Sequence, residues 1–145
     1  MAGMTRISRS VRQTRALAAE LARGLRGGEC IALDGELGAG KTQFVRGLVE
    51  GLGGSPQVVS SPTFVLLNVY ETPRLTVYHL DAYRVGPADF EGIGFFELLQ
   101  QGGVVVVEWA RRIAGLLPPD HISVTLETTG KSTRRITLQE GSAQG

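Results

Sequence analysis

GELGAGKT, at residues 35–42, is the stretch of sequence that decides the fold of this chain. It matches the phosphate-loop pattern G-x-x-x-x-G-K-[ST] without a mismatch. The glycines let the backbone turn so that successive N–H groups converge on phosphate oxygens, and the helix that follows adds the positive end of its dipole. Lys41 places an ammonium against the outer phosphates, and Thr42 offers a hydroxyl to Mg²⁺. The residues expected to contact a nucleotide are Leu37, Gly38, Ala39, Gly40, Lys41, Thr42 and Gln43.

The sequence on both sides of this stretch has the pattern that such a loop requires. Residues 30–33 are an apolar run of strand length, and residues 41–52 have the periodicity of an amphipathic helix. An earlier helix is expected over residues 11–26, with Ser10 as its N-cap. Strand, glycine loop and helix thus follow in order, which argues against a chance match in a glycine-rich turn.

The rest of the chain predicts an α/β fold. Residues 104–107 are all valine, as in a strand buried on both faces of a parallel sheet. Hairpins are expected from strands at 64–70 and 75–80 and from strands at 122–126 and 135–138, with helical segments at 87–100 and 109–116. We therefore expect one domain over residues 1–145 with a P-loop NTPase-like three-layer core, its parallel sheet extended by antiparallel strands. The first few residues and 141–145 are expected to be frayed.

The composition is typical of a globular protein, with 42% hydrophobic and 20% charged residues. No apolar run approaches the roughly eighteen residues of a membrane span, and the N-terminal stretch lacks the apolar core of a signal peptide. Cys30 is the only cysteine, so no internal disulfide can form. A cytoplasmic protein without membrane contact is expected.

The net charge of +1 is unevenly distributed. Residues 1–29 contain six arginines and two glutamates, whereas residues 30–110 contain four basic and nine acidic side chains. A near-neutral total argues against a protein dedicated to coating nucleic acid. The basic N-terminal stretch is interpreted as a solvated helix face, and contact with RNA or an acidic partner is the alternative.

Two carboxylates follow apolar runs and are candidates for holding the metal and the attacking water. Glu108 ends VVVVE and Asp81 ends LTVYHLD. An acid at such a position often only caps the next element, but a phosphate loop needs a carboxylate at the end of a neighbouring strand. We expect Glu108 to hold Mg²⁺ together with Thr42, and Asp81 to orient water on the γ-phosphate side. Lys41, Asp81 and Glu108 are the predicted catalytic residues.

Three further residues are candidates for a switch. His79 faces the same way as Asp81 on a strand, and a buried, hydrogen-bonded histidine is favoured over a catalytic base. Arg84 either stabilises transferred charge or pairs with an acid. Thr63, in the SSPT loop, either senses Mg²⁺ and γ-phosphate or caps a turn.

The nucleotide is expected to be ATP. Guanine-specific P-loop proteins carry an Asn-Lys-x-Asp base reader, and the single asparagine, Asn68, is followed by Val69. The guanine reader is therefore missing from this sequence.

Four motifs taken together resemble one family. GELGAGKTQFVRGL, SSPTF, YHLDAYR and VVVVEWARR look like the bacterial TsaE (YjeE) family, and the similarity spans about residues 10–140. The resemblance implies a small P-loop ATPase of the machinery that places threonylcarbamoyl on the adenosine beside the tRNA anticodon. It implies that the protein binds ATP with Mg²⁺ and, without partners, hydrolyses it slowly. It also implies that the protein acts together with the TsaB–TsaD pair and contacts tRNA only indirectly.

The resemblance also assigns residues by position. Lys41 and Thr42 match the family's phosphate and metal residues, Asp81 the acid of its H-x-D-x-Y-R motif, and Glu108 the acid of its E-W motif. Thr63 matches the threonine of its S-P-T switch. Ala110 stands where many members have proline, a departure that touches only the local turn.

Two other function classes remain open at this point. A small-molecule kinase is disfavoured because 145 residues with two hairpins leave little room for a lid and an acceptor pocket. A non-catalytic nucleotide switch would bind partners only with ATP present.

Overall fold

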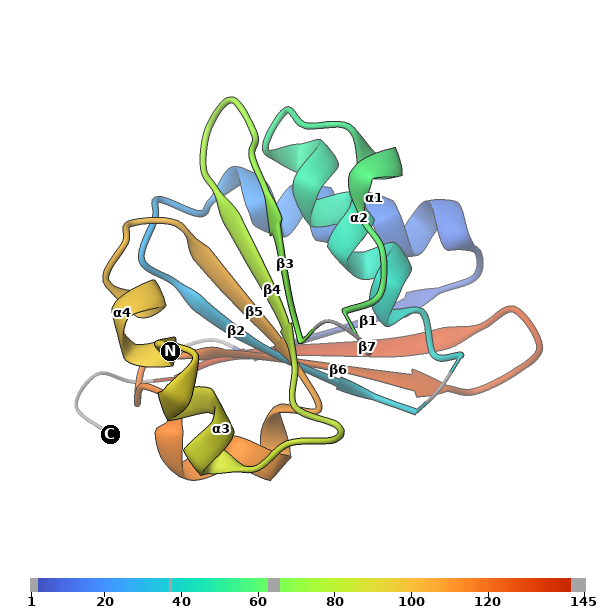
Figure 1. Ribbon diagram of the computed structural model, residues 1–145. Coiled ribbons are helices and arrows are strands. Elements are labelled where there is room, and N and C mark those ends of the chain that lie inside the picture. The colour runs from blue at the N-terminus through green and yellow to red at the C-terminus, as the bar shows by residue number, and fades with distance from the viewer. Residues whose placement is uncertain (1–2, 37, 63–65, 142–145) are drawn as a thin grey trace.

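The computed structural model describes residues 3–36, 38–62 and 66–141 (Figure 1). The strands are β1 (Gly3–Ser8), β2 (Cys30–Gly35), β3 (Leu67–Tyr70), β4 (Val77–Asp81), β5 (Val104–Glu108), β6 (Ile122–Thr128) and β7 (Arg134–Glu140). The α-helices are α1 (Val11–Arg23), α2 (Lys41–Gly51), α3 (Pro87–Gly92) and α4 (Phe95–Leu99), and the 3₁₀-helices are η1 (Pro56–Val58) and η2 (Ala110–Leu116).

All the strands belong to one seven-stranded sheet in the order β1-β7-β6-β2-β5-β4-β3. The central strands β6, β2, β5 and β4 run parallel to one another. β7 and β1 extend one side of this parallel core with antiparallel pairing, and β3 extends the other. The predicted fold class, a parallel P-loop-like core extended by antiparallel strands, is confirmed.

Helices cover both faces of the sheet, which gives three layers (Figure 1). The side chains of β5 contribute to both of the resulting cores. Val104 and Val106 belong to the core under α1 and α2, whereas Val105 and Val107 belong to the core under α3, α4 and η2. Because side chains alternate across a strand, an unbroken valine run supplies both cores at once.

The helix preceding the phosphate loop is close to its expected position. Ser10 is the N-cap of α1, and its hydroxyl accepts a hydrogen bond from the N–H of Gln13 at 3.1 Å. The helix ends at Arg23, three residues before the predicted end. The expected helix over 87–100 is divided into α3 and α4 at Gly94, whose φ of 84° only glycine adopts readily.

The expectation that the first few residues are frayed is wrong for Gly3–Ser8, which form β1 on the edge of the sheet. Each residue of β1 has a register partner on β7, from Gly3 opposite Gln139 to Ser8 opposite Arg134. Five of the six β1 residues are exposed, so the segment lacks the apolar alternation that would have identified it as a strand. At the other end, Gly141 donates its N–H to the carbonyl of His121 at 2.9 Å.

In the described part of the chain, no helix combines the length and the apolar character needed to cross a bilayer.

The close packing of α1 on α2 depends on glycine at position 47. A Cβ there would press on the Arg15 carbonyl and lie 2.7 Å from the Cβ of Ala18. We expect Gly47→Ala to lower the free energy of unfolding by about 1–3 kcal/mol, since the helices would have to move apart. Chemical denaturation with urea measures the change.

Gly92, in α3, is the matched control, because a Cβ at this position would meet no atom within 4 Å. Gly92→Ala is expected to leave stability unchanged or slightly raised, as alanine has the higher helix propensity. An equal loss of unfolding free energy in the two variants would show that Gly47 is not needed for the close packing of α1 on α2.

Candidate phosphate-binding site

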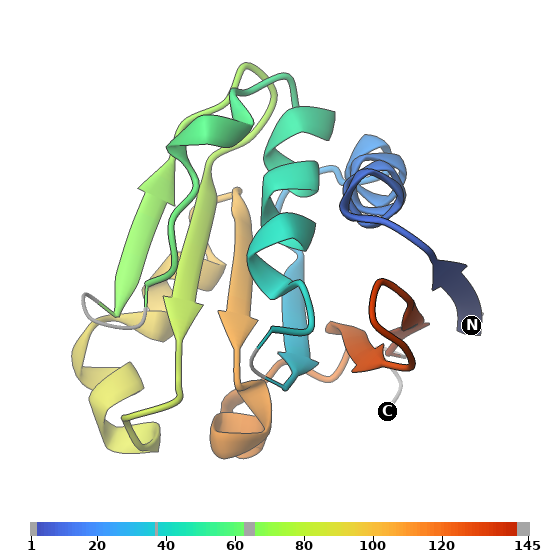
Figure 2. The same ribbon diagram turned by 90° about the vertical axis from the view of Figure 1, so that its right-hand side faces the viewer.

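The candidate site lies at the carboxyl ends of the inner strands β2, β4 and β5. These strands are parallel neighbours, with Leu33 opposite Glu108 and Asp81 opposite Glu108, and the loop into α2 leaves from the same edge (Figure 2). Since residues two apart share a face of a strand, His79 and Asp81 continue the face of Val77, which packs under α1 and α2. Strand geometry therefore places these polar side chains beside the start of α2.

The backbone of the loop takes conformations that favour glycine. Gly38 and Gly40 have φ values of 80° and 102°. Gly40 is the N-cap of α2 and has no side chain to accept from the first N–H groups of the helix. A bound oxyanion would supply acceptors at this helix end, where the dipole also favours negative charge.

Lys41 is 7% exposed, and its ammonium sits inside the site. Nζ donates to the carbonyl of Gly35 at 2.5 Å and lies 4.2 Å from the centroid of the Trp109 ring. Burial lowers the pKa of Lys41 below its ordinary value, and the negative charges of Glu108, Asp81 and Asp34 partly oppose that shift. The ammonium is thus poorly solvated, and the negative charges of three carboxylates favour its charged form.

Trp109 holds its place through an unusual backbone conformation. Its φ of 58° and ψ of 37° lie in the left-handed region, and its N–H donates to the carbonyl of Leu33 at 3.2 Å. The centroid of its ring lies 4.8 Å from the centroid of the Tyr83 ring. A non-glycine residue in this region is under strain, and here that conformation puts the indole beside Lys41.

Arg134 fastens the phosphate loop to the hairpin of β6 and β7. Nε donates to the carbonyl of Ala39 at 3.2 Å, and Nη2 to that of Gly38 at 3.1 Å. Nη1 donates to the carbonyls of Gly130 and Thr133. With these donors committed to carbonyls, the guanidinium fixes the loop. The sequence analysis missed Arg134, because nothing local marks a residue 95 positions from its partner.

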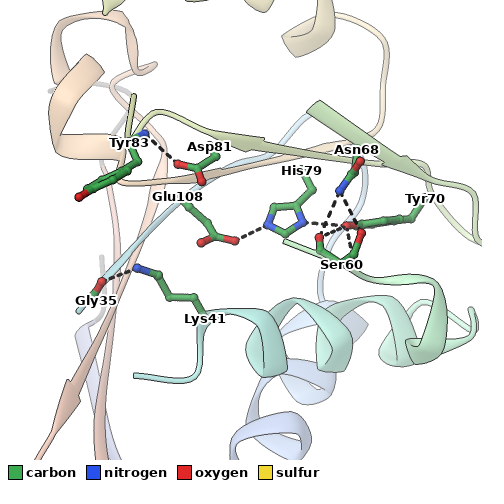
Figure 3. A network of polar contacts seen from close by, with 9 residues as sticks. All are labelled: Gly35, Lys41, Ser60, Asn68, Tyr70, His79, Asp81, Tyr83 and Glu108. Atoms are coloured by element: carbon green, nitrogen blue, oxygen red, sulfur yellow. Dashed lines mark hydrogen bonds and ion pairs between the residues drawn. The ribbon is translucent and has the colours of Figure 1, made fainter. Parts of the chain in front are cut away.

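The two predicted acids are buried, and each has one carboxylate oxygen engaged (Figure 3). Oε2 of Glu108 lies 2.5 Å from Nε2 of His79, and Oδ1 of Asp81 accepts the N–H of Tyr83 at 2.8 Å. Oδ2 of Asp81 is buried without a hydrogen-bond partner among the described residues. Asp34, which the sequence analysis did not single out, is a third acid here and lies 3.8 Å from Nε of Arg111.

A cavity of about 600 Å³ opens between the loop, the start of α1 and the β6–β7 turn. The predicted nucleotide-contacting residues Gly38, Ala39, Gly40, Lys41, Thr42 and Gln43 line it, and so do Glu108 and Trp109. The sequence analysis did not assign the other walls, which include Arg9, Ser10, Val11, Thr14, Ser61, Lys131, Ser132 and Arg134.

The remaining predicted residues lie elsewhere. His79 and Asp81 are buried in β4 and are not among the described residues that line the cavity. Arg84 is exposed in the turn after β4 and is likewise not one of those lining residues. Leu37 and Thr63 lie outside the described residues.

The residues present fit a nucleotide phosphate with Mg²⁺. The carboxylate of Glu108, which lines the cavity, is an oxygen ligand of the kind that Mg²⁺ prefers, and so is the unpartnered oxygen of Asp81, which is buried on the neighbouring strand. In the part of the chain that the structure describes, no three His, Cys, Asp or Glu side chains are grouped to hold a metal alone. A Mg²⁺ ion bound with phosphates uses only one or two protein carboxylates.

Comparison with known proteins identifies the relatives of this chain. The model of the family "Threonylcarbamoyl adenosine biosynthesis protein TsaE" matches residues 8–136. The TsaE protein of Treponema pallidum is 41% identical over 133 residues, covering 91% of this chain and 97% of that protein. The TsaE protein of Bacillus subtilis is 38% identical over 126 residues, covering 87% of this chain and 78% of that protein.

A solved structure agrees with these relatives. The crystal structure of YdiB from Bacillus subtilis superposes with a TM-score of 0.81 at 29% sequence identity, covering 99% of this chain and 88% of that one. The family match extends from the last residue of β1 into β7 and so includes the whole candidate site. The chain belongs to the TsaE family of tRNA threonylcarbamoyladenosine biosynthesis proteins.

Proposed function

We propose that this protein binds ATP with Mg²⁺, hydrolyses it, and thereby serves tRNA threonylcarbamoyladenosine synthesis together with a TsaB–TsaD pair. The observation that carries the proposal is the buried ammonium of Lys41, which bonds a carbonyl of the phosphate loop beside the cavity and whose charge is favoured by nearby carboxylates. A buried cation among acids, next to uncapped helix N–H groups, suits a ligand that brings both phosphate and metal.

The proposed contacts follow from the walls of the cavity. Lys41 exchanges its contact with the Gly35 carbonyl for phosphate oxygens, and the N–H groups at the start of α2 bind the same phosphates. The hydroxyl of Thr42 and the carboxylate of Glu108, which both line the cavity, would hold Mg²⁺, and the ion would supply positive charge to stabilise the phosphoryl group. Arg134 keeps the loop in the conformation that these contacts require.

Asp81 is proposed to orient the attacking water. One of its oxygens is fixed by the N–H of Tyr83, which leaves the other oriented and without a partner among the described residues. A buried carboxylate oxygen held in this way is a suitable acceptor for a proton of water. Thr63, His79 and Arg84 remain proposed switch residues.

Adenine and the protein partners are supported by different arguments. The missing Asn-Lys-x-Asp reader disfavours guanine. The family's description assigns it to threonylcarbamoyladenosine biosynthesis, a modification pathway that implies partner proteins. TsaB and TsaD come from the resemblance of the four motifs.

The first test replaces the ammonium. Lys41→Ala is expected to weaken ATP binding on the order of a hundredfold, comparable to losing a charge-assisted interaction of about 3 kcal/mol. Isothermal calorimetry is the appropriate measurement, because Lys41 lies against the Trp109 ring and its removal alone would change the fluorescence. Unchanged affinity in a folded variant would refute the role of Lys41.

The second test separates hydrolysis from binding. Asp81→Asn is expected to slow ATP hydrolysis by about 10²- to 10⁴-fold while ATP affinity changes little, because the amide orients water poorly. Phosphate release measures the rate. Glu127→Gln, at an exposed acid paired with Arg135, is the control and should keep the wild-type rate. If cells carrying Asp81→Asn still modify tRNA without hydrolysis, the protein is a nucleotide-dependent switch rather than an ATPase.

The third test concerns the partners. ATP hydrolysis is expected to be slow for the protein alone and faster when TsaB and TsaD are added, with the Lys41→Ala variant inactive in both mixtures. Phosphate release and tRNA modification are measured in the same samples, with and without ATP. Equal hydrolysis rates with and without the pair would contradict a partner-coupled ATPase.

A further inference from the structure

Two parts of the cavity wall are joined behind it by a chain of hydrogen bonds. Glu108, at the end of β5, and Ser61, in the loop after η1, both line the cavity. Oε2 of Glu108 is 2.5 Å from Nε2 of His79, and Nδ1 of His79 is 2.9 Å from the hydroxyl of Tyr70. That hydroxyl donates to the carbonyl of Ser60 at 2.8 Å and accepts the N–H of Ser60 at 3.2 Å (Figure 3).

The part of this chain from Glu108 to Tyr70 is enclosed by protein, whereas Ser60 at its far end is exposed. His79 is 0% exposed, with both ring nitrogens engaged, and Glu108 and Tyr70 are 4% and 5% exposed. Water cannot readily replace a partner that moves, so a broken contact leaves a buried polar group unsatisfied. Hydrogen bonds in such surroundings are also stronger than in water and reinforce one another. A displacement of Glu108 is therefore passed through His79 to Tyr70, whose hydroxyl bonds both the N–H and the carbonyl of Ser60.

Ser60 has a second anchor that does not lead to the site. Nδ2 of Asn68 donates to the carbonyl of Ser60 at 3.2 Å and to its hydroxyl at 3.3 Å. Asn68 lies opposite His79 in the β3–β4 register, and its amide interacts with the Tyr70 hydroxyl as well as with Ser60. Removing the Asn68 amide loosens Ser60 and takes one neighbour from the Tyr70 hydroxyl, but it leaves that hydroxyl in contact with both Ser60 and His79. Removing the Tyr70 hydroxyl cuts the path to Glu108.

We propose that His79 and Tyr70 are positioning residues that couple the carboxylate of Glu108 to the loop of residues 59–62. When Glu108 engages Mg²⁺, its shift is transmitted through the imidazole and the phenol to Ser60, and the loop presents Ser61 to the cavity accordingly. The inference rests on the proposed function in that Glu108 must face Mg²⁺ bound with a nucleotide. It assigns to His79 a mechanical role rather than that of a base.

The test compares Tyr70→Phe with Asn68→Ala. Amide hydrogen exchange of Ser60 and Ser61 is measured with a non-hydrolysable ATP analogue, once with Mg²⁺ and once with EDTA. In the wild type and in Asn68→Ala, Mg²⁺ is expected to change the exchange rate by about tenfold, the equivalent of roughly one hydrogen bond. In Tyr70→Phe, which loses only an oxygen atom, that Mg²⁺ dependence is expected to disappear.

Two histidine variants cut the chain at different bonds and serve if Tyr70→Phe does not fold. A Gln amide can take the place of Nε2 of His79 and an Asn amide that of Nδ1, so His79→Gln breaks the link to Tyr70 and His79→Asn the link to Glu108. Both are expected to lose the Mg²⁺ dependence at Ser60. Retention of the full dependence in Tyr70→Phe or in both histidine variants, or an equal loss in Asn68→Ala, would overturn the coupling.

Calorimetric titration of the same analogue distinguishes this inference from the proposed function. Wild-type binding with no effect of Mg²⁺ on Ser60 or Ser61 overturns the coupling alone. A wild-type protein that does not bind the analogue with Mg²⁺ overturns both.

Discussion

The buried ammonium of Lys41, bonded to the Gly35 carbonyl and stabilised by nearby negative charge, is the constraint on which the site depends. Lys41 is the first residue of α2, and its side chain reaches back to the last residue of β2. Burial lowers the pKa of Lys41 and the nearby acids raise it. A phosphate ligand would add further negative charge and so favour the ammonium form. The end of β2, the indole of Trp109 and the start of α2 all lie next to this one charge.

The parallel sheet explains why the acids gather there. Asp34, near the end of β2, lies on the opposite face of the sheet beside Arg111. Parallel strands have their carboxyl ends on one side of the sheet, so Asp81 and Glu108, the last residues of β4 and β5, are register partners although they are far apart in sequence. Further along the same face the residues become apolar and pack under α1 and α2. A single strand thus passes from the apolar core to the polar site. His79 lies between the two parts of β4: it is fully buried, as core residues are, and both of its ring nitrogens have polar partners.

Prediction from the sequence worked best where the signal was local or strongly periodic. The valine run of β5, the strand–loop–helix unit around Lys41 and the cap at Ser10 all have the expected form. The prediction of a frayed N-terminus was wrong for Gly3–Ser8, because the edge strand β1 is exposed and has no apolar pattern that would identify it as a strand. Tyr70 and Arg134 were missed for a related reason: each acts through backbone groups of distant residues, which leave no trace in sequence spacing.

By itself, the sequence determined the chemistry at the loop, since glycine, lysine and threonine at fixed spacing dictate how a short segment turns and what it offers to a ligand. It also pointed to Asp81 and Glu108 at the strand ends, because an apolar run that stops at a carboxylate is readable locally. Only the tertiary structure decided which groups stand behind them: the imidazole on Glu108, the phenol on Ser60 and the guanidinium on the loop carbonyls. Such pairings depend on register and packing between segments remote in sequence, and those are set by the folded sheet as a whole.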